Sequence, residues 1–184
     1  MQSSPSEYEL VKLSKEGNIE AFSKLIDLYR QKVFQTCMGF LHSRDDAEDL
    51  TQDIFIKVWN SLKSFDERST FSTWLYRIAV NSAINQVRKN KLRSFVGLSK
   101  AVNDFSNPSE NADHRLMRTE VKQEIKEAIG RLKINQRKAF ILVYYQELSI
   151  KEVASVMKIS PKAAESLLFR ARKNLQKMLS QKTN

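Results

Sequence analysis

Residues 149–179 read SIKEVASVMKISPKAAESLLFRARKNLQKML, and this stretch decides the fold of the C-terminal half of the chain. Ser149, followed three residues later by Glu152, forms the capping-box pattern that opens a helix. Ser160 offers a second cap, and Pro161 then stands at the first helical position, where its missing N–H has no partner to lose. The pattern predicts a short helix, a three-residue turn and a long helix, which is helix-turn-helix architecture.

The two faces of the long predicted helix differ in chemistry. One face is apolar at helical spacing, through Ala164, Leu168, Ala171, Leu175 and Leu179. The opposite face carries cations, a hydroxyl and an aromatic ring, namely Lys162, Ser166, Phe169, Arg170, Lys173 and Lys177. Such groups suit phosphates and base edges in a major groove, although a lysine-rich face exposed only to solvent is the simpler alternative. The caps and the turn favour DNA binding.

The net charge of +10 is confined to the second half of the chain. Residues 1–90 carry 12 basic and 12 acidic side chains, whereas residues 91–184 carry 19 basic and 9 acidic ones. A second basic cluster, Arg77, Arg88, Lys89, Lys91 and Arg93, has no acid among residues 77–93. Two separated basic patches indicate a polyanionic partner that is contacted twice.

The remainder of the chain is predicted to be helical as well. With 4 glycines and 3 prolines in 184 residues, the chain lacks the turn residues of a sandwich or barrel. Ser4 and Glu7 suggest an N-terminal capping box with Pro5 at the first helical position, and Gly17-Asn18 ends that helix. Ser43 caps a helix whose buried stripe is predicted to be Ala47, Leu50, Ile54, Val58 and Leu62. Further helices are expected from about Ser69 or Thr70 to Lys91, from Asp113 to Gly130 and from Asn135 to Gln146.

A polar stretch rich in serine and asparagine divides the predicted helices into two groups. Residues 94–112 have little hydrophobic periodicity, which is typical of a flexible linker. The predicted fold class is all-α, with two small helical domains at residues 1–93 and 113–184.

The stretch from Phe71 to Asn85 mixes aromatic residues with arginine and asparagine. Aromatic rings stack on unpaired bases, and arginine and asparagine bind phosphates and base edges, so this surface suits separated strands. Phe65 in the preceding polar loop offers a further ring for a flipped base. The alternative is that Phe71 and Trp74 belong to the hydrophobic core, and the pattern leaves Trp74 undecided between core and DNA.

An acidic cluster at residues 45–53 has two interpretations. Asp49 and Asp53 lie one helical turn apart, but no histidine or glycine-containing calcium loop accompanies them, so we predict no metal. A protein partner with a basic face is the better interpretation, because acidic, amide, aliphatic and aromatic groups combine on one helix face at Asp49, Gln52, Asp53, Ile56 and Trp59.

Several function classes are disfavoured by what the sequence contains. Cys37 alone cannot form a disulfide framework, and no apolar run approaches the ~18 residues of a membrane span. No signal peptide is visible, so we expect a cytoplasmic protein without membrane insertion. His42 and His114 fall in different predicted domains and Cys37 has an apolar helical setting, so we predict no catalysis and no cofactor.

Taken in order, three motifs resemble those of a bacterial RNA polymerase sigma factor of the sigma-70 family, and more closely of its extracytoplasmic-function (ECF) group. They are Asp46 to Trp59, Phe71 to Asn81, and Leu148 to Arg172, and the resemblance extends over about residues 8–180. It implies a region 2 helical bundle, a linker and a region 4 helix-turn-helix domain. It also implies that the chain gives core RNA polymerase its promoter specificity, separates the strands and performs no covalent chemistry.

The resemblance assigns roles to the matched residues. The clamp helices of the polymerase's largest subunit would bind Asp49, Gln52, Asp53, Ile56 and Trp59. The −10 element would be read and melted by Phe65, Ser72, Trp74, Arg77, Asn81, Asn85, Arg88 and Lys89. The −35 element would contact Ser160, Lys162, Ser166, Phe169, Arg170 and Lys173. The helix before the helix-turn-helix would pack on the flap tip of the second-largest subunit, and the family also implies an anti-sigma factor.

This chain departs from the family at Glu165 and Leu167, where many relatives have basic residues on the recognition helix. An acid at that place opposes contact with phosphate. We therefore hypothesise that −35 recognition is weak and that promoter choice depends on the −10 element or on an additional DNA-targeting partner.

The alternative function is a stand-alone helix-turn-helix transcriptional regulator, which is usually a symmetric dimer on a palindrome. The sequence has no clear dimerisation heptad, and such a regulator leaves the aromatic and basic first domain unexplained.

Overall fold

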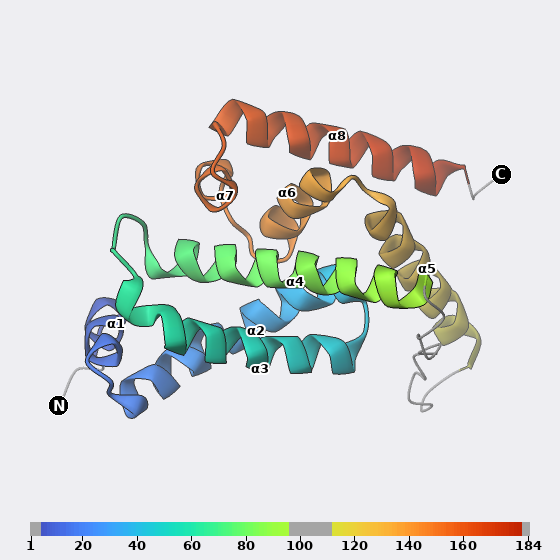
Figure 1. Cartoon of the computed structure of the whole chain (residues 1–184). Coiled ribbons are helices and arrows are strands. Elements are labelled where there is room, and N and C mark those ends of the chain that lie inside the picture. Colours follow the sequence, from blue (N-terminus) through green and yellow to red (C-terminus); the bar gives the residue numbers. More distant parts are fainter. Residues whose placement is uncertain (1–4, 96–111, 182–184) are drawn as a thin grey trace. The chain divides into compact units, whose positions relative to one another are not determined.

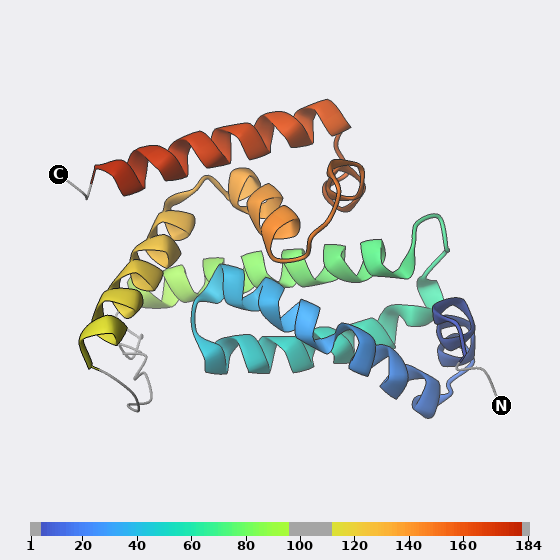
Figure 2. The ribbon, with the colours of Figure 1, turned by 180° about the vertical axis from the view of Figure 1, so that it is seen from behind.

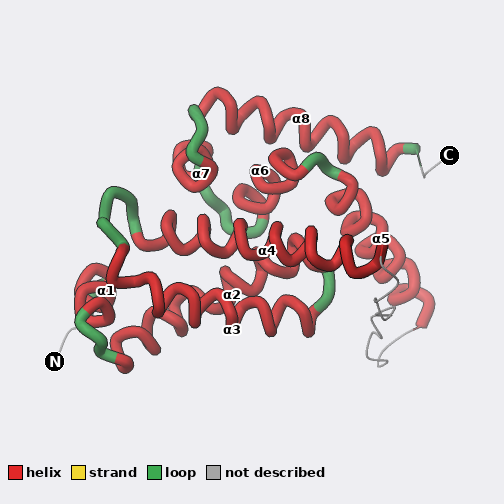
Figure 3. The backbone as a smooth tube through the Cα atoms, in the orientation of Figure 1, coloured by secondary structure: helices red, strands yellow, loops and turns green. Residues whose placement is uncertain are grey.

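The computed structural model describes residues 5–95 and 112–181, and within these ranges it is helical without a strand (Figures 1 and 3). Most of the predicted linker therefore lies outside the described residues. The elements, in chain order, are α1 (Glu7–Lys15), α2 (Ile19–Leu41), α3 (Arg44–Ser61), the 3-10 turn η1 (Leu62–Ser64), α4 (Phe71–Phe95), α5 (Ala112–Arg131), α6 (Ile134–Tyr144), α7 (Ile150–Met157) and α8 (Pro161–Ser180). The prediction of an all-α fold is confirmed.

The chain forms two compact units, Met1–Gln86 and Val87–Asn184, and the division falls within α4. The predicted domain limits at residues 93 and 113 stay a prediction.

In the first unit α2 packs along both α1 and α3, as both views of the ribbon show (Figures 1 and 2). The predicted stripe of α3 is buried in full, from Ala47 to Leu62. The first half of α4 supplies Leu75, Tyr76 and Ala79 to the same core. With Val80, Ala83 and Ile84, these residues form one broad buried side of α4, and the opposite side faces outward.

In the second unit α8 packs against α5, α6 and α7. Ala171 and Leu175 of α8 lie in a core cluster with Ala128, Ile129 and Leu132 of the α5 region. Between α8 and α6, the Asn174 amide donates a hydrogen bond to Gln136 Oε1 at 2.9 Å. Because the apolar stripe of α8 packs into this core, the opposite face of α8 points outward.

The helix starts follow their capping residues closely. Ser43 and Ser160 accept hydrogen bonds from the backbone N–H groups of Asp46 and Ala163, as predicted. Ser149 and Glu152 form the predicted reciprocal capping box. These side chains satisfy helix N–H groups that otherwise have no partner within the helix.

The predicted cap of the first helix is wrong by two residues. The N-cap is Ser6, which forms a capping box with Glu9, so Pro5 precedes the helix instead of starting it. The sequence fits both registers, because Ser4 and Ser6 each have a glutamate three residues later. Hydrogen bonds from Ser6 to the Glu9 carboxylate lower the pKa of Glu9.

The turn between α7 and α8 contains one left-handed residue, Lys158, at φ 56° and ψ 47°. Its backbone N–H and that of Ile159 close the end of α7. Glycine adopts this conformation without the steric cost that a Cβ adds.

Lys158→Gly is expected to stabilise the second unit by about 0.5–1 kcal/mol, since the relief of Cβ strain exceeds glycine's extra entropy loss. Lys158→Ala keeps the Cβ and should leave stability nearly unchanged. Urea unfolding monitored by circular dichroism compares the two, and equal midpoints for both variants would contradict the argument.

Candidate nucleic-acid and protein interfaces

The predicted DNA-facing residues of α8 all lie at the surface. Lys162, Ser166, Phe169, Arg170 and Lys173 are exposed, and the capping residue Ser160 is exposed at the start of the helix. Opposite them, Ala164, Leu168, Ala171 and Leu175 are buried. The Arg170 Nε donates to the Ser166 carbonyl at 3.0 Å, which holds the guanidinium along the helix surface.

Phe169 is 67 % exposed on the outward face of α8. Burial of this ring in a contact with a partner would be favourable. A phenylalanine in a DNA groove contacts the thymine methyl group.

Two charged residues of α8, Glu165 and Arg172, affect how much positive charge this face presents. Glu165 is exposed and Leu167 is half-buried, so the acid identified in the sequence does face solvent. Arg172 donates to the Tyr144 hydroxyl at 2.6 Å and lies over that ring at 5.5 Å from its centroid. Arg172 therefore serves the packing of α8 against α6, in contrast to Arg170.

The outward face of α4 collects most of the predicted single-strand contacts. Trp74, Arg77, Asn81 and Asn85 follow one another three or four residues apart, which places them on one side of the helix. Asn81 and Asn85 are exposed, while Trp74 and Arg77 are half-buried. Ser72 is half-buried near the helix start, and Arg88 and Lys89 are exposed on later turns.

Trp74 has a packing role and a surface role together. Its ring centroid lies 5.0 Å from that of Phe65 and 5.9 Å from that of Phe71. Phe65 and Phe71 are each 4 % exposed, so they are the buried members of this aromatic cluster. The ring of Phe65 is thus a support for Trp74 in this structure rather than an exposed stacking surface.

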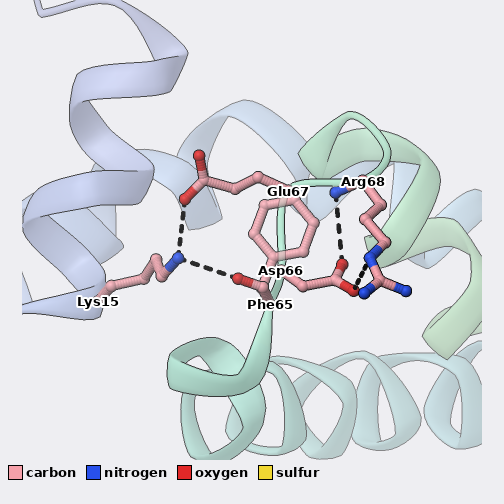
Figure 4. A network of polar contacts seen from close by, with 5 residues as sticks. All are labelled: Lys15, Phe65, Asp66, Glu67 and Arg68. Atoms are coloured by element: carbon pink, nitrogen blue, oxygen red, sulfur yellow. Dashed lines mark hydrogen bonds and ion pairs between the residues drawn. The ribbon is translucent and has the colours of Figure 1, made fainter.

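The connecting loop (residues 65–70) joins η1 to α4 and is shown in Figure 4. Thr70 ends it by accepting a hydrogen bond from the Thr73 N–H at 3.2 Å, which makes Thr70 the cap of α4. Arg68 pairs with Asp66 at 3.1 Å within the loop. From outside the loop, the Lys15 ammonium of α1 donates to the Phe65 carbonyl and to Glu67.

The outward face of α3 presents the predicted protein-binding residues together. Asp49, Gln52, Asp53 and Ile56 are exposed, and Trp59 is half-buried with its centroid 4.8 Å from that of Phe22. Ile56 is 60 % exposed. An apolar groove of about 410 Å³ between α2 and α3 adjoins this face and is lined in part by Phe22, Phe55, Ile56 and Trp59. Acidic groups beside an open apolar groove suit a protein partner whose contact surface has an apolar centre and a basic rim.

Sequence reasoning missed two parts of these surfaces. It did not identify Phe22 and Ile26 as groove residues, because helical spacing does not show which two helices meet. It also missed Lys15, which is 50 residues from Phe65 in sequence. No local sequence pattern predicts the contact between Lys15 and Phe65.

Cys37, the one cysteine of the sequence, is buried. Burial raises the pKa of Cys37 to about 11, so its thiol stays protonated at neutral pH and is a poor nucleophile. Within the described ranges, no group of three or more His, Cys, Asp or Glu residues is arranged to hold a metal ion. In the same ranges no helix is long and apolar enough to cross a membrane.

The first unit carries an aromatic and polar face on α4 and an acidic face beside an apolar groove on α3, and the second unit carries a helix-turn-helix. Residues 25–93 match the family described as Sigma-70 region 2, and residues 122–175 match Sigma-70, region 4. The chain belongs to the ECF group of the sigma-70 family of RNA polymerase sigma factors.

Similar proteins agree with this assignment. The ECF RNA polymerase sigma factor SigW of Bacillus subtilis is 31 % identical over 176 residues, which is 92 % of this chain and 94 % of SigW. A structure of CnrH in complex with the cytosolic domain of CnrY aligns with a TM-score of 0.71 and 26 % identity, over 94 % of this chain and 96 % of CnrH. The sigma factor RpoE from Bartonella quintana, in complex with the anti-sigma factor NepR, aligns with a TM-score of 0.64 and 27 % identity, over 88 % of this chain and 98 % of RpoE.

Proposed function

We propose that this ECF sigma factor uses three helix faces for three different contacts. The α3 face binds core RNA polymerase, the α4 face with the connecting loop reads and melts the −10 element, and the α8 face contacts the −35 element. One observation carries the proposal: motifs far apart in sequence each present their polar and aromatic residues on an exposed face, opposite a buried stripe.

The polymerase contact is argued from charge and shape. The exposed acids Asp49 and Asp53 stand beside the groove that Phe22 and Trp59 line. Charged groups around an apolar centre steer association and then exclude water from the contact. The clamp helices of the largest subunit are the proposed partner, and the flap tip of the second-largest subunit is proposed to bind the helix that precedes the helix-turn-helix.

Strand separation is argued from the α4 face. Trp74 rests on the buried rings of Phe65 and Phe71, so it is held ready to stack on a base without reordering. Asn81 and Asn85 continue this face with hydrogen-bonding amides, and Arg88 and Lys89 add positive charge farther along the helix.

Recognition of the −35 element is proposed to be weak because Glu165 is exposed on the recognition helix. A carboxylate near the DNA backbone repels phosphate and offsets part of the attraction of Arg170 and Lys173. Promoter choice then depends on the −10 element or on an additional DNA-targeting partner.

Glu165→Lys is expected to raise the affinity of the chain for a −35 duplex about fivefold to tenfold at low salt, and to steepen the salt dependence by about one phosphate contact. Glu165→Gln removes the repulsion without adding a contact and should give a smaller gain. Fluorescence anisotropy over a salt series measures both. Unchanged affinity in Glu165→Lys would show that this residue does not face DNA.

Regulation by an anti-sigma factor is proposed from the solved relatives. RpoE binds the anti-sigma factor NepR, and CnrH binds the cytosolic domain of CnrY. The exposed acidic and apolar face of α3 supports binding of a regulatory protein by this chain too. We propose that the protein acts in the cytoplasm, together with polymerase and DNA, and that it performs no covalent chemistry.

A stand-alone regulator is the competing function, and binding tests separate the two. A sigma factor should form a complex with core RNA polymerase in gel filtration, and its promoter footprint should require the polymerase. A footprint of the same strength on free DNA, with no polymerase complex, would favour the stand-alone regulator.

A further inference from the structure

We propose that Lys15 of α1 is a positioning residue for the connecting loop (residues 65–70), and that it thereby sets the selectivity of the chain among −10 sequences. This inference rests on the proposed function, in which that loop and the start of α4 read the −10 element. Lys15 lies before residues 25–93, the segment that matches region 2.

The contact is specific in geometry. The Lys15 ammonium donates to the Phe65 carbonyl at 2.9 Å and to Glu67 Oε1 at 2.7 Å (Figure 4). It also lies 5.8 Å from the centroid of the Phe65 ring. One cation therefore holds both a backbone group at the first residue of the loop and a side chain two residues later.

The loop needs such support because part of it is strained. Glu67 is in the left-handed region at φ 59°, a conformation that disfavours a residue with a Cβ. The Glu67 side chain is 45 % exposed, whereas the Lys15 side chain is 26 % exposed. Lys15, which lies on a helix, is thus more buried than Glu67, which lies in the loop. We therefore treat Lys15 as the fixed partner that holds the loop in place.

The anchor itself is fixed from two sides. Ser14, the preceding residue, is buried and its hydroxyl donates to the Leu10 carbonyl at 2.6 Å. At the other end of α1, the Tyr29 hydroxyl of α2 donates to Glu7, and the Tyr29 ring lies 5.6 Å from that of Phe71 at the start of α4. Helix α1 is therefore linked to the beginning of α4 by way of Tyr29 of α2, and it contacts the loop directly through Lys15.

The contact also balances charge where single-stranded DNA is proposed to bind. Asp66 pairs with Arg68, and Glu67 pairs with Lys15, so the two acids of the loop each have a cation. Loss of Lys15 would leave Glu67 facing a polyanion. Position and charge are thus separate contributions, and the variants below distinguish them.

Lys15→Met removes the ammonium and keeps most of the aliphatic stem. We expect amide hydrogen exchange over residues 65–70 of the full chain to accelerate, and transcription selectivity among promoters that differ only in the −10 element to fall. Each change should be about threefold to tenfold, as for the loss of one charge-assisted hydrogen bond and one partly exposed ion pair.

Three further variants serve as controls. Lys12→Met removes an exposed charge of the same helix and should change neither measurement. Lys15→Arg retains donors for both acceptors and should keep most of the selectivity. Lys15→Met combined with Glu67→Gln restores the charge balance but not the anchor, so its exchange should stay fast and its selectivity low.

The outcomes are decisive in each direction. Unchanged exchange in Lys15→Met, or fast exchange with unchanged selectivity, overturns the positioning role while leaving the proposed function intact. Recovery of selectivity in the double variant overturns it in favour of a charge effect. If the unmodified chain starts no promoter-dependent transcription with core polymerase, the proposed function fails and this inference fails with it.

Discussion

Reversing both exposed acids of the α3 face, by Asp49→Arg together with Asp53→Arg, is expected to reduce the affinity for core RNA polymerase on the order of 100-fold. Like charges brought together at an interface cost several kcal/mol, and each tenfold loss corresponds to about 1.4 kcal/mol. Both side chains are exposed, so the fold should persist. Titration of labelled chain with core polymerase, read by anisotropy, measures the loss.

A matched control separates the interface from the change in overall charge. Glu16→Arg with Glu20→Arg adds the same positive charge at exposed positions at the end of α1 and the start of α2. This control should bind polymerase within about twofold of the unmodified chain, as surface changes away from an interface usually do. Equal losses in the two double variants would show that binding follows net charge and not the α3 face.

Trp74→Ala is expected to reduce promoter opening about tenfold to 100-fold, because one aromatic platform for an unpaired base is worth about 1–3 kcal/mol. Permanganate reactivity of thymines in the −10 region measures the opened fraction. The substitution also removes the packing of this ring against Phe65 and Phe71, which contributes to the loss.

Trp74→Phe separates stacking from packing, because it keeps an aromatic ring against Phe65 and Phe71. It should retain most of the opening. A template with a pre-melted −10 region should rescue Trp74→Ala, since the cost of separating the strands has been removed. Normal opening by Trp74→Ala, or failure of the pre-melted template to rescue it, contradicts the role given to this ring.

The helix-turn-helix could be predicted almost residue by residue, because its signals are local. Ser149 with Glu152, and Ser160 with Pro161, act over three residues and a single helix turn. The buried stripe of α8 likewise follows from spacing along one helix. The capping residues and the spacing of apolar residues are visible in the sequence, and the folded chain uses them in the same way.

The surroundings of the connecting loop could not be predicted, because they depend on contacts between distant segments. The sequence shows that Phe65 is aromatic, but its burial depends on Phe71 and on how α4 packs. In the sequence, Lys15 resembles the other surface cations of an amphipathic helix. Only the folded structure shows that its ammonium donates to the Phe65 carbonyl. The groove beside Ile56 depends in the same way on how α2 lies against α3.

Even a local signal fails where two registers have equal quality. Ser4 with Glu7 and Ser6 with Glu9 are the same capping pattern displaced by two residues. The structure uses the second one. The capping pattern alone therefore leaves the first residue of this helix undecided.

Run-off transcription tests the central claim most directly. Core RNA polymerase from the source organism would be incubated with a genomic promoter library, with and without the purified chain. We predict new start sites that appear only with the chain, share a −10 element and have a loosely defined −35 element. The contrary result is a chain that binds the same DNA without polymerase and produces no new start sites.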